Sequence, residues 1–308
     1  MAIWITGARG FIGRYLSKQL SKSGNYSIGI GNGERLINEK EEWGLKKFIK
    51  QPVLRANLDK IAEQEGEPDA IFHLAGGSSV GASFLDPSED FQRTINSAFE
   101  LFEWVRTKTP KTSIVVVSSA AVYGSGKNGF ISASASTNPF SPYGYHKLML
   151  EELTRSFSKN FGLYTVIVRL FSVYGPFLRK QLLWDLCSRL AIETDQLQLA
   201  GDGGELRDWT EVSDIARLLE DALVLACPQS KTINGGSGIG TSVKEITEEV
   251  IANWGKQIPI SFSGQSRVGD PYSLISTPCE ILNSNFKFKI PIKVGISNYV
   301  NWFKKNIL

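Results

Sequence analysis

Cysteine, histidine and net charge are all scarce in this sequence. Its 308 residues include three cysteines (Cys187, Cys227 and Cys279), an odd number spread far apart, and two histidines, His73 and His146. These counts exclude a disulfide framework and a zinc site, so we expect no metal. The formal net charge is only +3. No basic run interleaved with aromatic residues is present, so there is no reason to expect a nucleic-acid partner.

Long apolar segments are also missing. No uninterrupted apolar stretch reaches about 18 residues, and the N-terminus carries no charged-then-apolar leader. We therefore expect a cytoplasmic protein with no membrane span. With 308 residues, of which 42% are hydrophobic and 21% charged, the chain can bury a full core as one large domain or two unequal lobes.

A glycine-rich turn follows the first apolar segment. Residues 1–5 read as a buried strand, and apolar residues over 15–20 have helical spacing. Between them, Gly7 permits a tight turn, Gly10 lets the backbone approach a pyrophosphate, and Gly13 allows close packing of helix on strand. The alternative is an ordinary strand-to-helix loop. We favour a dinucleotide site, with the phosphate charge at the helix N-terminus.

Apolar runs alternate with amphipathic segments over the first half of the chain. We expect strands at 3–5, 27–30, 53–54, 70–74, 114–117 and 165–170, and helices at 91–105 and 147–161. This alternation predicts an α/β fold with a doubly wound parallel sheet, whose ligands bind at the carboxyl ends of the strands. Candidate residues follow five of these strands: Gly7, Gly31-Asn32, Asn57, Ala75-Gly76 and Ser118-Ser119.

The pattern loosens after about residue 175. Helices near 180–193, 213–226 and 242–254 are separated by glycine-rich loops. We divide the chain into a nucleotide-binding domain at 1–175 and a smaller C-terminal lobe at 176–308, which can be interleaved with the first.

Tyr143 and Lys147 are the most informative pair of side chains. At positions i and i+4 of a helix they share one face, so both can point into one pocket. A free phenol ionises near pH ~10. We expect the lysine, together with an oxidised nicotinamide, to favour the phenolate, and Ser119 to bond the same substrate oxygen. The alternative is a solvated helix face. Tyr145 faces another way and has only Met149 four residues on.

Seven motifs occur in one order along the chain: Thr6-Gly7-x-x-Gly10-x-x-Gly13, Ile71-Phe-His-Leu-Ala-Gly76, Val117-Ser-Ser-Ala-Ala-Val-Tyr-Gly124, Ser141-Pro-Tyr-Gly-Tyr-His-Lys147, Arg169-Leu-Phe-Ser-Val-Tyr-Gly-Pro176, Arg207-Asp-Trp-Thr-Glu-Val-Ser-Asp214 and Arg267-Val-Gly-Asp270. With these motifs the chain resembles the extended short-chain dehydrogenases/reductases of the nucleotide-sugar epimerase/dehydratase family almost end to end. The resemblance implies a Rossmann-type fold with a substrate-binding lobe, and an NAD(P)-dependent enzyme of polysaccharide biosynthesis acting on a nucleoside-diphosphate sugar.

The resemblance also assigns roles to residues. Ser119, Tyr143 and Lys147 take the catalytic positions. The cofactor-binding set is Gly7, Arg9, Gly10, Phe11, Ile12, Gly13, Asn32, Arg35, Asn57, Leu58, Leu74, Ala75, Gly76, Ser118, Tyr143 and Lys147. The substrate-binding set is Ser79, Ser119, Ala120, Tyr143, Ser172, Arg207, Arg267 and Asp270. The guanidinium groups of Arg207 and Arg267 suit diphosphate oxygens. We expect His73 to be a core residue, Asp208 to be structural, and Asp214 to cap a helix.

The cofactor choice depends on a missing acid. Family members that use NAD usually place a carboxylate at the end of the second strand, where this chain has Gly31-Asn32. Arg9 and Arg35 can both reach a 2′-phosphate there, which favours NADP over NAD. The alternative is that both arginines are solvated and the cofactor is NAD.

The residues at the end of the fifth predicted strand indicate the type of reaction. Dehydratases of the family usually carry Thr-Asp-Glu there, and this chain has Ser118-Ser119-Ala120. We therefore expect a 4-epimerase. Two alternatives stay open: an NADPH-dependent reductase of 4-keto-6-deoxy sugars, and a non-catalytic dinucleotide-binding regulator. The resemblance further implies a homodimer formed through a four-helix bundle of the segments 91–105 and 147–161.

Overall fold

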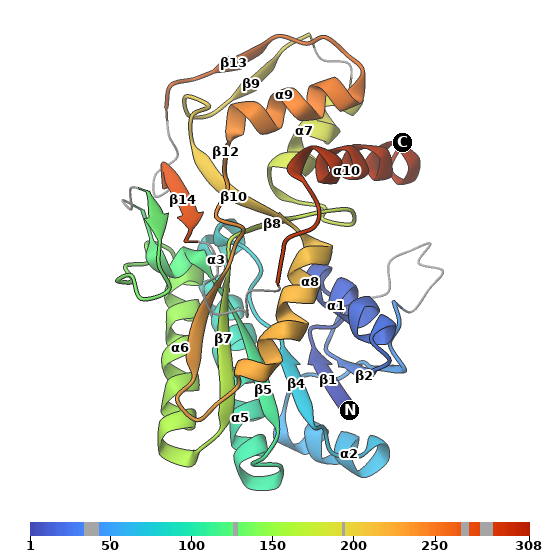
Figure 1. Cartoon of the computed structure of the whole chain (residues 1–308), viewed down its shortest axis with the longest axis vertical. Coiled ribbons are helices and arrows are strands. Elements are labelled where there is room, and N and C mark those ends of the chain that lie inside the picture. The colour runs from blue at the N-terminus through green and yellow to red at the C-terminus, as the bar shows by residue number, and fades with distance from the viewer. Residues whose placement is uncertain (34–42, 126–128, 193–194, 266–270, 278–285) are drawn as a thin grey trace.

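The computed structural model describes residues 1–33, 43–125, 129–192, 195–265, 271–277 and 286–308. Its centre is a parallel seven-stranded sheet with the order β11-β7-β5-β4-β1-β2-β3 (Figure 1). This confirms the expected doubly wound α/β fold. The strands are β1 (Ala2–Thr6), β2 (Tyr26–Ile30), β3 (Lys47–Ile49), β4 (Ala70–His73), β5 (Ser113–Ser119), β7 (Tyr164–Leu170) and β11 (Lys231–Gly235).

Strand β1 illustrates why helices cover both faces of the sheet. Successive side chains of a strand point to opposite faces. Ile3 and Ile5 therefore pack with α1 (Phe11–Lys22) and α8 (Val212–Ala222), whereas Trp4 packs on the other side, where its ring stacks on Trp104 with centroids 5.2 Å apart. That second face is covered by α2 (Arg55–Glu65), α5 (Ser97–Lys108) and α6 (Pro142–Phe161).

The third strand differs from the prediction. We expected it at residues 53–54, but the strand beside β2 is β3 (Lys47–Ile49), at the edge of the sheet. Because β3 is only partly buried and contains a lysine, it lacks the apolar run that marks a central strand. Pro52 has no backbone N–H to donate to a neighbouring strand, and α2 begins at Arg55, which leaves no room for a strand between them. Asn57 therefore lies in the first turn of a helix and not at a strand end.

The helices before and after β5 frame the site. The segment predicted as one helix at 91–105 is α4 (Pro87–Phe91), a π-helical turn (Gln92–Asn96) and α5 in succession. The helix predicted at 147–161 begins earlier, at Pro142. Ser141 caps it by accepting a hydrogen bond from Gly144 N at 3.1 Å. Two short helical segments complete this part, α3 (Val80–Leu85) and a 3₁₀ turn (Ala120–Tyr123).

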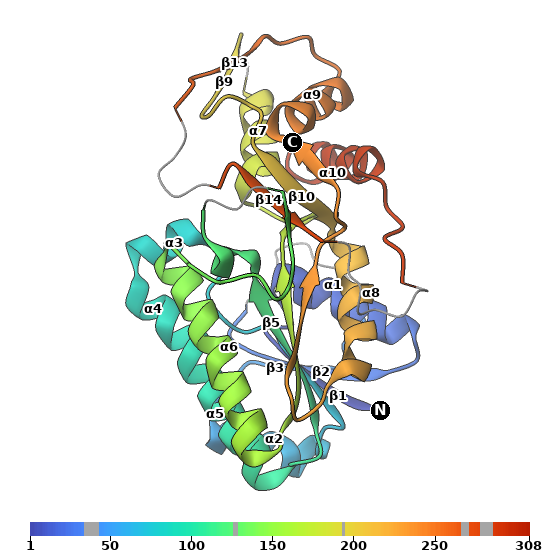
Figure 2. The ribbon, with the colours of Figure 1, turned by 60° about the vertical axis from the view of Figure 1, so that its left-hand side comes forward.

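A second lobe lies over the carboxyl ends of the sheet strands (Figures 1 and 2). Its sheet has the order β12-β10-β14-β6, with β8 beside β10. Three helices share an apolar core with it: α7 (Gln181–Ala191), α9 (Val243–Trp254) and α10 (Ile292–Asn306). The strands are β6 (Phe130–Ile131), β8 (Ser172–Tyr174), β10 (Leu206–Glu211), β12 (Gly240–Ser242) and β14 (Ser273–Ser276), and β9 (Leu197–Leu199) pairs with β13 (Ile260–Phe262).

The chain returns to the large sheet after entering the lobe. Helix α8, a 3₁₀ turn (Leu223–Leu225) and edge strand β11 all come from beyond residue 176, and β11 pairs in parallel with β7. The two parts are therefore interleaved in sequence. The domain boundary at residue 175 stays a prediction.

Candidate active site

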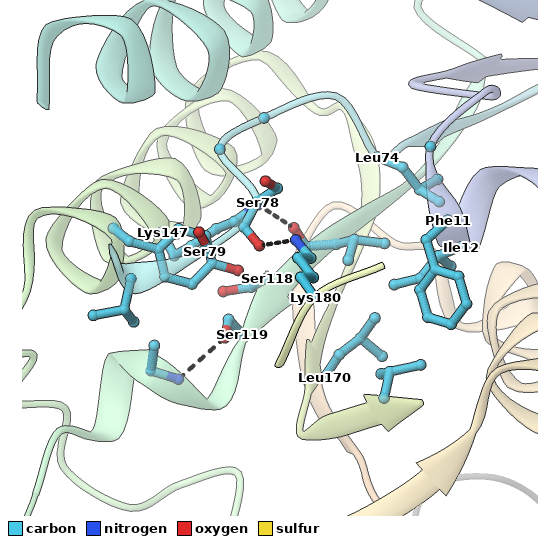
Figure 3. A pocket seen from close by; sticks show the side chains of 18 of the residues that line it. Phe11, Ile12, Leu74, Ser78, Ser79, Ser118, Ser119, Lys147, Leu170 and Lys180 are labelled. Atoms are coloured by element: carbon cyan, nitrogen blue, oxygen red, sulfur yellow. Dashed lines mark hydrogen bonds between the residues drawn. The ribbon is translucent and has the colours of Figure 1, made fainter. Parts of the chain in front are cut away.

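One cavity of about 1620 Å³ lies between the carboxyl ends of the sheet and the lobe. Six strands of the large sheet, or the segments that follow them, contribute to its wall, together with residues of the lobe. Figure 3 shows Ser78, Ser79 and Lys147 on one side, Phe11, Ile12 and Leu74 on the other, and Ser118 and Ser119 between them. The site predicted at the strand ends and the lobe therefore border the same space.

The glycine turn leaves room for a phosphate group. Gly7 has a φ of +72°, and its N–H donates to Ile30 O at 2.8 Å. A Cβ on Gly13 would lie 2.4 Å from Gly7 O, so only glycine allows α1 to approach this closely. Gly10 caps α1 without a side chain, and the first turn of α1 contains no acidic residue. Its amides therefore face the cavity without a competing carboxylate, which fits a dinucleotide pyrophosphate.

Ser119, Tyr143 and Lys147 meet at the end of β5. The hydroxyl of Ser119 accepts a hydrogen bond from Ala121 N at 3.2 Å and lies near enough to the Tyr143 phenol to influence its pKa. The Lys147 side chain is buried, and its Nζ donates to Val117 O at 3.1 Å and lies 5.8 Å from the centroid of the Tyr143 ring. The structure thus brings the three predicted catalytic side chains together at one wall of the cavity.

Burial controls the charge of this site. It raises the pKa of the Tyr143 phenol, the nearby hydroxyl of Ser119 acts in the opposite direction, and the charge of Asp90 raises the pKa further. The expected lowering of this pKa is therefore not produced by the protein alone, because burial outweighs the effect of Ser119. Burial also lowers the pKa of Lys147 to about 8, although the carboxylates of Asp90 and Glu151 act to raise it.

Buried side chains form a hydrogen-bonded network beside the end of β5. Ser118 Oγ donates to Glu151 Oε1 at 2.7 Å, and Arg169 Nε donates to the same oxygen at 2.8 Å. Arg169 also donates to the hydroxyl of Tyr123 at 2.9 Å. Because the Ser118 hydroxyl donates its proton to Glu151, its side chain could meet the predicted cofactor contact only as an acceptor.

Most of the predicted binding residues line the cavity. These are Gly7, Arg9, Gly10, Phe11, Ile12, Gly13, Asn32, Leu74, Ala75, Gly76, Ser79, Ser118, Ala120, Ser172 and Arg207. Two lie elsewhere: Asn57 donates from its amide to Pro52 O at 3.0 Å, and Leu58 is buried in the core. Arg35, Arg267 and Asp270 fall outside the described residues.

Three predictions concerned structural residues. His73 is a neutral core residue, since burial lowers its pKa to about 3. Asp208 is buried and accepts hydrogen bonds from Ser237 and Ser276. Asp214 does not cap α8, because Glu211 is the capping residue. The carboxylate of Asp214 instead accepts from the backbone of residues 289 and 290.

Lys180 is a cavity residue that the sequence patterns missed. It precedes α7, and its Nζ donates to Ser78 O at 2.5 Å, so the lobe reaches the loop after β4 across the cavity (Figure 3). Burial lowers the pKa of Lys180. Since the two partners are 102 residues apart and belong to no motif, no local sequence signal identifies them.

The described part of the chain has neither a membrane-spanning helix nor a cluster of metal ligands. Among the described residues, no helix is long and apolar enough to cross a membrane. Within the same part of the chain, no group of histidine, cysteine, aspartate and glutamate is arranged to hold a metal ion.

Comparison with known proteins identifies the family. Residues 3–234 match the model of the NAD-dependent epimerase/dehydratase family. A Bacillus subtilis protein described as the uncharacterized UDP-glucose epimerase YtcB is 30% identical over 286 residues, covering 88% of this chain and 87% of the relative. MoeE5, solved with UDP-glucuronic acid and NAD, superposes with a TM-score of 0.85 at 27% identity, covering 99% of each chain. A UDP-glucose 4-epimerase from Thermotoga maritima shares the fold, with a TM-score of 0.88 at 24% identity and complete coverage of both chains. The chain belongs to the NAD-dependent epimerase/dehydratase family of enzymes.

Proposed function

We propose that this enzyme is a UDP-sugar 4-epimerase that oxidises and re-reduces the sugar carbon with NAD(P). The observation that carries the proposal is the cavity whose lining includes both the glycine turn and the side chains of Ser119, Tyr143 and Lys147. Relatives described as UDP-glucose epimerases and UDP-glucose 4-epimerases support the substrate class. The bound nicotinamide would take a hydride from the sugar and return it to the opposite face.

The chain itself would move the accompanying proton. Tyr143 exchanges it with the sugar hydroxyl, and Ser119 holds the same oxygen through a second hydrogen bond. Lys147 would stabilise the phenolate of Tyr143, which accepts the proton of the sugar hydroxyl on oxidation and is formed again when that proton returns to the sugar oxygen on re-reduction. Since the pKa of Lys147 is about 8, Lys147 is protonated in most molecules at neutral pH.

Two cations near the lobe suit the anionic part of the substrate. Arg207 lies on β10 and lines the cavity, and a guanidinium group can bind diphosphate oxygens through two parallel hydrogen bonds. Lys180 reaches in from the start of α7. Its described hydrogen-bond acceptor is a neutral carbonyl, which leaves its charge to be balanced by an anionic oxygen of the substrate.

We further propose that the cofactor site accepts NADP. Arg9 Cζ lies 3.8 Å from the centroid of the Phe48 ring, which holds the guanidinium at the ends of β1 and β2. The described cavity residues at this end, Gly31, Asn32 and Gly33, carry no carboxylate. A 2′-phosphate there would gain a charge-assisted hydrogen bond without facing a like charge.

We also propose a homodimer formed through α5 and α6. Four large apolar side chains on these helices are substantially exposed: Phe99 at 44%, Tyr145 at 52%, Met149 at 45% and Phe161 at 51%. Exposed apolar side chains gathered on two adjacent helices are typical of an interface. Met149→Glu should shift the molar mass measured by light scattering from dimer to monomer, whereas an unchanged mass would reject this interface.

The experiment for the main proposal is to incubate the enzyme with UDP-glucose, UDP-N-acetylglucosamine and UDP-glucuronate, with and without added NADPH. The proposal expects interconversion of 4-epimers with no net consumption of cofactor. Tyr143→Phe should lower kcat by about a hundredfold to ten-thousandfold while cofactor binding is preserved. Tyr145→Phe is the matched control and should retain activity. Stoichiometric loss of NADPH with a 4-keto sugar would establish a reductase instead.

A further inference from the structure

A buried carboxylate and an imidazole lie beside the proposed catalytic residues. Asp90 in α4 is only 5% exposed, and its Oδ2 lies 2.5 Å from Nδ1 of His146, whose side chain is 12% exposed. The ring of Phe91 packs edge-on against the imidazole, with centroids 5.4 Å apart. A carboxylate buried to this degree requires a hydrogen-bonding partner, and His146 provides one.

The loop after β4 is shaped around this carboxylate. A Cβ on Gly77 would lie 1.7 Å from Asp90 Oδ1, so the absence of a side chain there lets the carboxylate sit directly against the backbone. The preceding residue approaches the catalytic lysine, since a Cβ on Gly76 would lie 3.2 Å from Lys147 Nζ. Because consecutive Cα atoms are only ~3.8 Å apart, Asp90 and Lys147 contact neighbouring points of one loop that also lines the cavity.

The electrostatic effect of Asp90 reaches both catalytic groups. Its charge raises the pKa of Lys147, against the larger lowering by burial, and it adds to the raised pKa of Tyr143. His146 is adjacent to Lys147 in sequence and holds Asp90 in place from the same helix, α6.

The other charged groups around Asp90 have different partners. Glu89 and Arg93 form an exposed pair on its own helical segment. Glu151 also acts on Lys147, but it pairs with Arg169 and Arg155. Lys180 contacts Ser78 O on the same loop. Of the carboxylates named here, Asp90 alone acts on both Lys147 and Tyr143.

We propose that the Asp90–His146 pair is a positioning element of the active site: His146 holds the Asp90 carboxylate against the loop that Lys147 also approaches, where its negative charge acts on both Lys147 and Tyr143. This inference rests on the proposed function, because it gives Tyr143 and Lys147 their acid–base roles. Asp90 touches neither substrate nor cofactor in this scheme. It acts through the two residues that do.

The sign of the effect can be tested by removing the charge. Asp90→Asn keeps the size of the side chain and takes away one negative charge. The pKa values of Tyr143 and Lys147 should then both fall. If phenol ionisation sets the acidic limb of the rate profile and loss of the lysine proton sets the alkaline limb, both limbs should move to lower pH. A merely structural role would lower the rate without moving both limbs in one direction.

The experiment compares pH profiles of kcat for wild type, Asp90→Asn and Glu89→Gln. The control removes a charge from the neighbouring, exposed position and should leave both limbs in place. In parallel, NMR of the ¹³C-labelled lysine side chain, assigned with Lys147→Met, follows the pKa of Lys147 without any turnover. The expected result is a value below the wild-type value of about 8 in Asp90→Asn and no change in Glu89→Gln.

Two further variants separate misfolding from a true negative. His146→Asn retains an amide donor near the position of Nδ1 and should preserve the wild-type pKa of Lys147. His146→Leu removes the donor that holds the Asp90 carboxylate in place and should lower the pKa of Lys147. An unchanged Lys147 pKa in both Asp90→Asn and His146→Leu would overturn the inference. If wild type turns over no UDP-sugar, the proposed function fails, while the NMR titration still decides the role of Asp90.

Discussion

Replacing Lys147 by methionine should make this protein more stable and inactive at the same time. Burial lowers the pKa of Lys147 from 10.5 to about 8. One pKa unit corresponds to ~1.4 kcal/mol, so holding the ammonium in the folded state costs about 3 kcal/mol. Methionine has a similar length and no charge. Loss of the hydrogen bond to Val117 O offsets ~1 kcal/mol of the gain, which leaves a net stabilisation of about 2 kcal/mol.

The pH dependence gives this prediction its sharpest test. A lysine whose pKa is lowered in the folded state destabilises the protein by the full amount when the pH is below that folded-state pKa. The destabilisation decreases as the pH rises from the folded-state pKa of about 8 towards the pKa of the unfolded state. The advantage of Lys147→Met should therefore be about 2 kcal/mol at pH ~7 and close to zero at pH ~10. Urea unfolding followed by tryptophan fluorescence measures both values, provided that the m-value is unchanged.

Two outcomes would refute the reasoning. Lys147→Met could be less stable than wild type at neutral pH, or its advantage could be the same at both pH values. The neighbouring carboxylates do not complicate the result, because Asp90 keeps His146 and Glu151 keeps Arg169 as partners. Loss of turnover in the stabilised variant would show that the buried ammonium is retained for function at the expense of stability.

Three other predictions concern the cavity and its loop. Arg9→Leu should raise the Kd for NADP about tenfold to a hundredfold and change the Kd for NAD about twofold or less, as measured by calorimetry; equal losses for both cofactors would contradict the 2′-phosphate contact. Lys180→Met should raise KM for the UDP-sugar about tenfold with little effect on kcat, and an unchanged KM would remove Lys180 from substrate binding. Gly77→Ala should destabilise the protein by ~1–3 kcal/mol by displacing Asp90, and Asp90→Ser should suppress this loss in a double-mutant cycle. Gly81→Ala is its control, because a Cβ there would meet nothing within 4 Å.

The parts of the fold that were predictable are those with local signals. Apolar runs predicted β1, β4, β5 and β7, because a central strand of a parallel sheet is buried on both faces. The third strand was missed, since β3 is a partly buried edge strand with no such run. Glycine spacing predicted the turn after β1, where the structure has a positive φ at Gly7 and a close approach at Gly13.

The site could be predicted from the sequence only where its residues belong to a single helix or strand. The shared face of Tyr143 and Lys147 follows from the residue order, because helical periodicity places residues i and i+4 together. The tertiary structure alone decided that Asp90 lies against His146, 56 residues away, and that Lys180 reaches Ser78 across the cavity. Such pairs depend on how separate elements pack, and the pKa values of Lys147 and Lys180 depend on burial, which no local pattern of residues encodes.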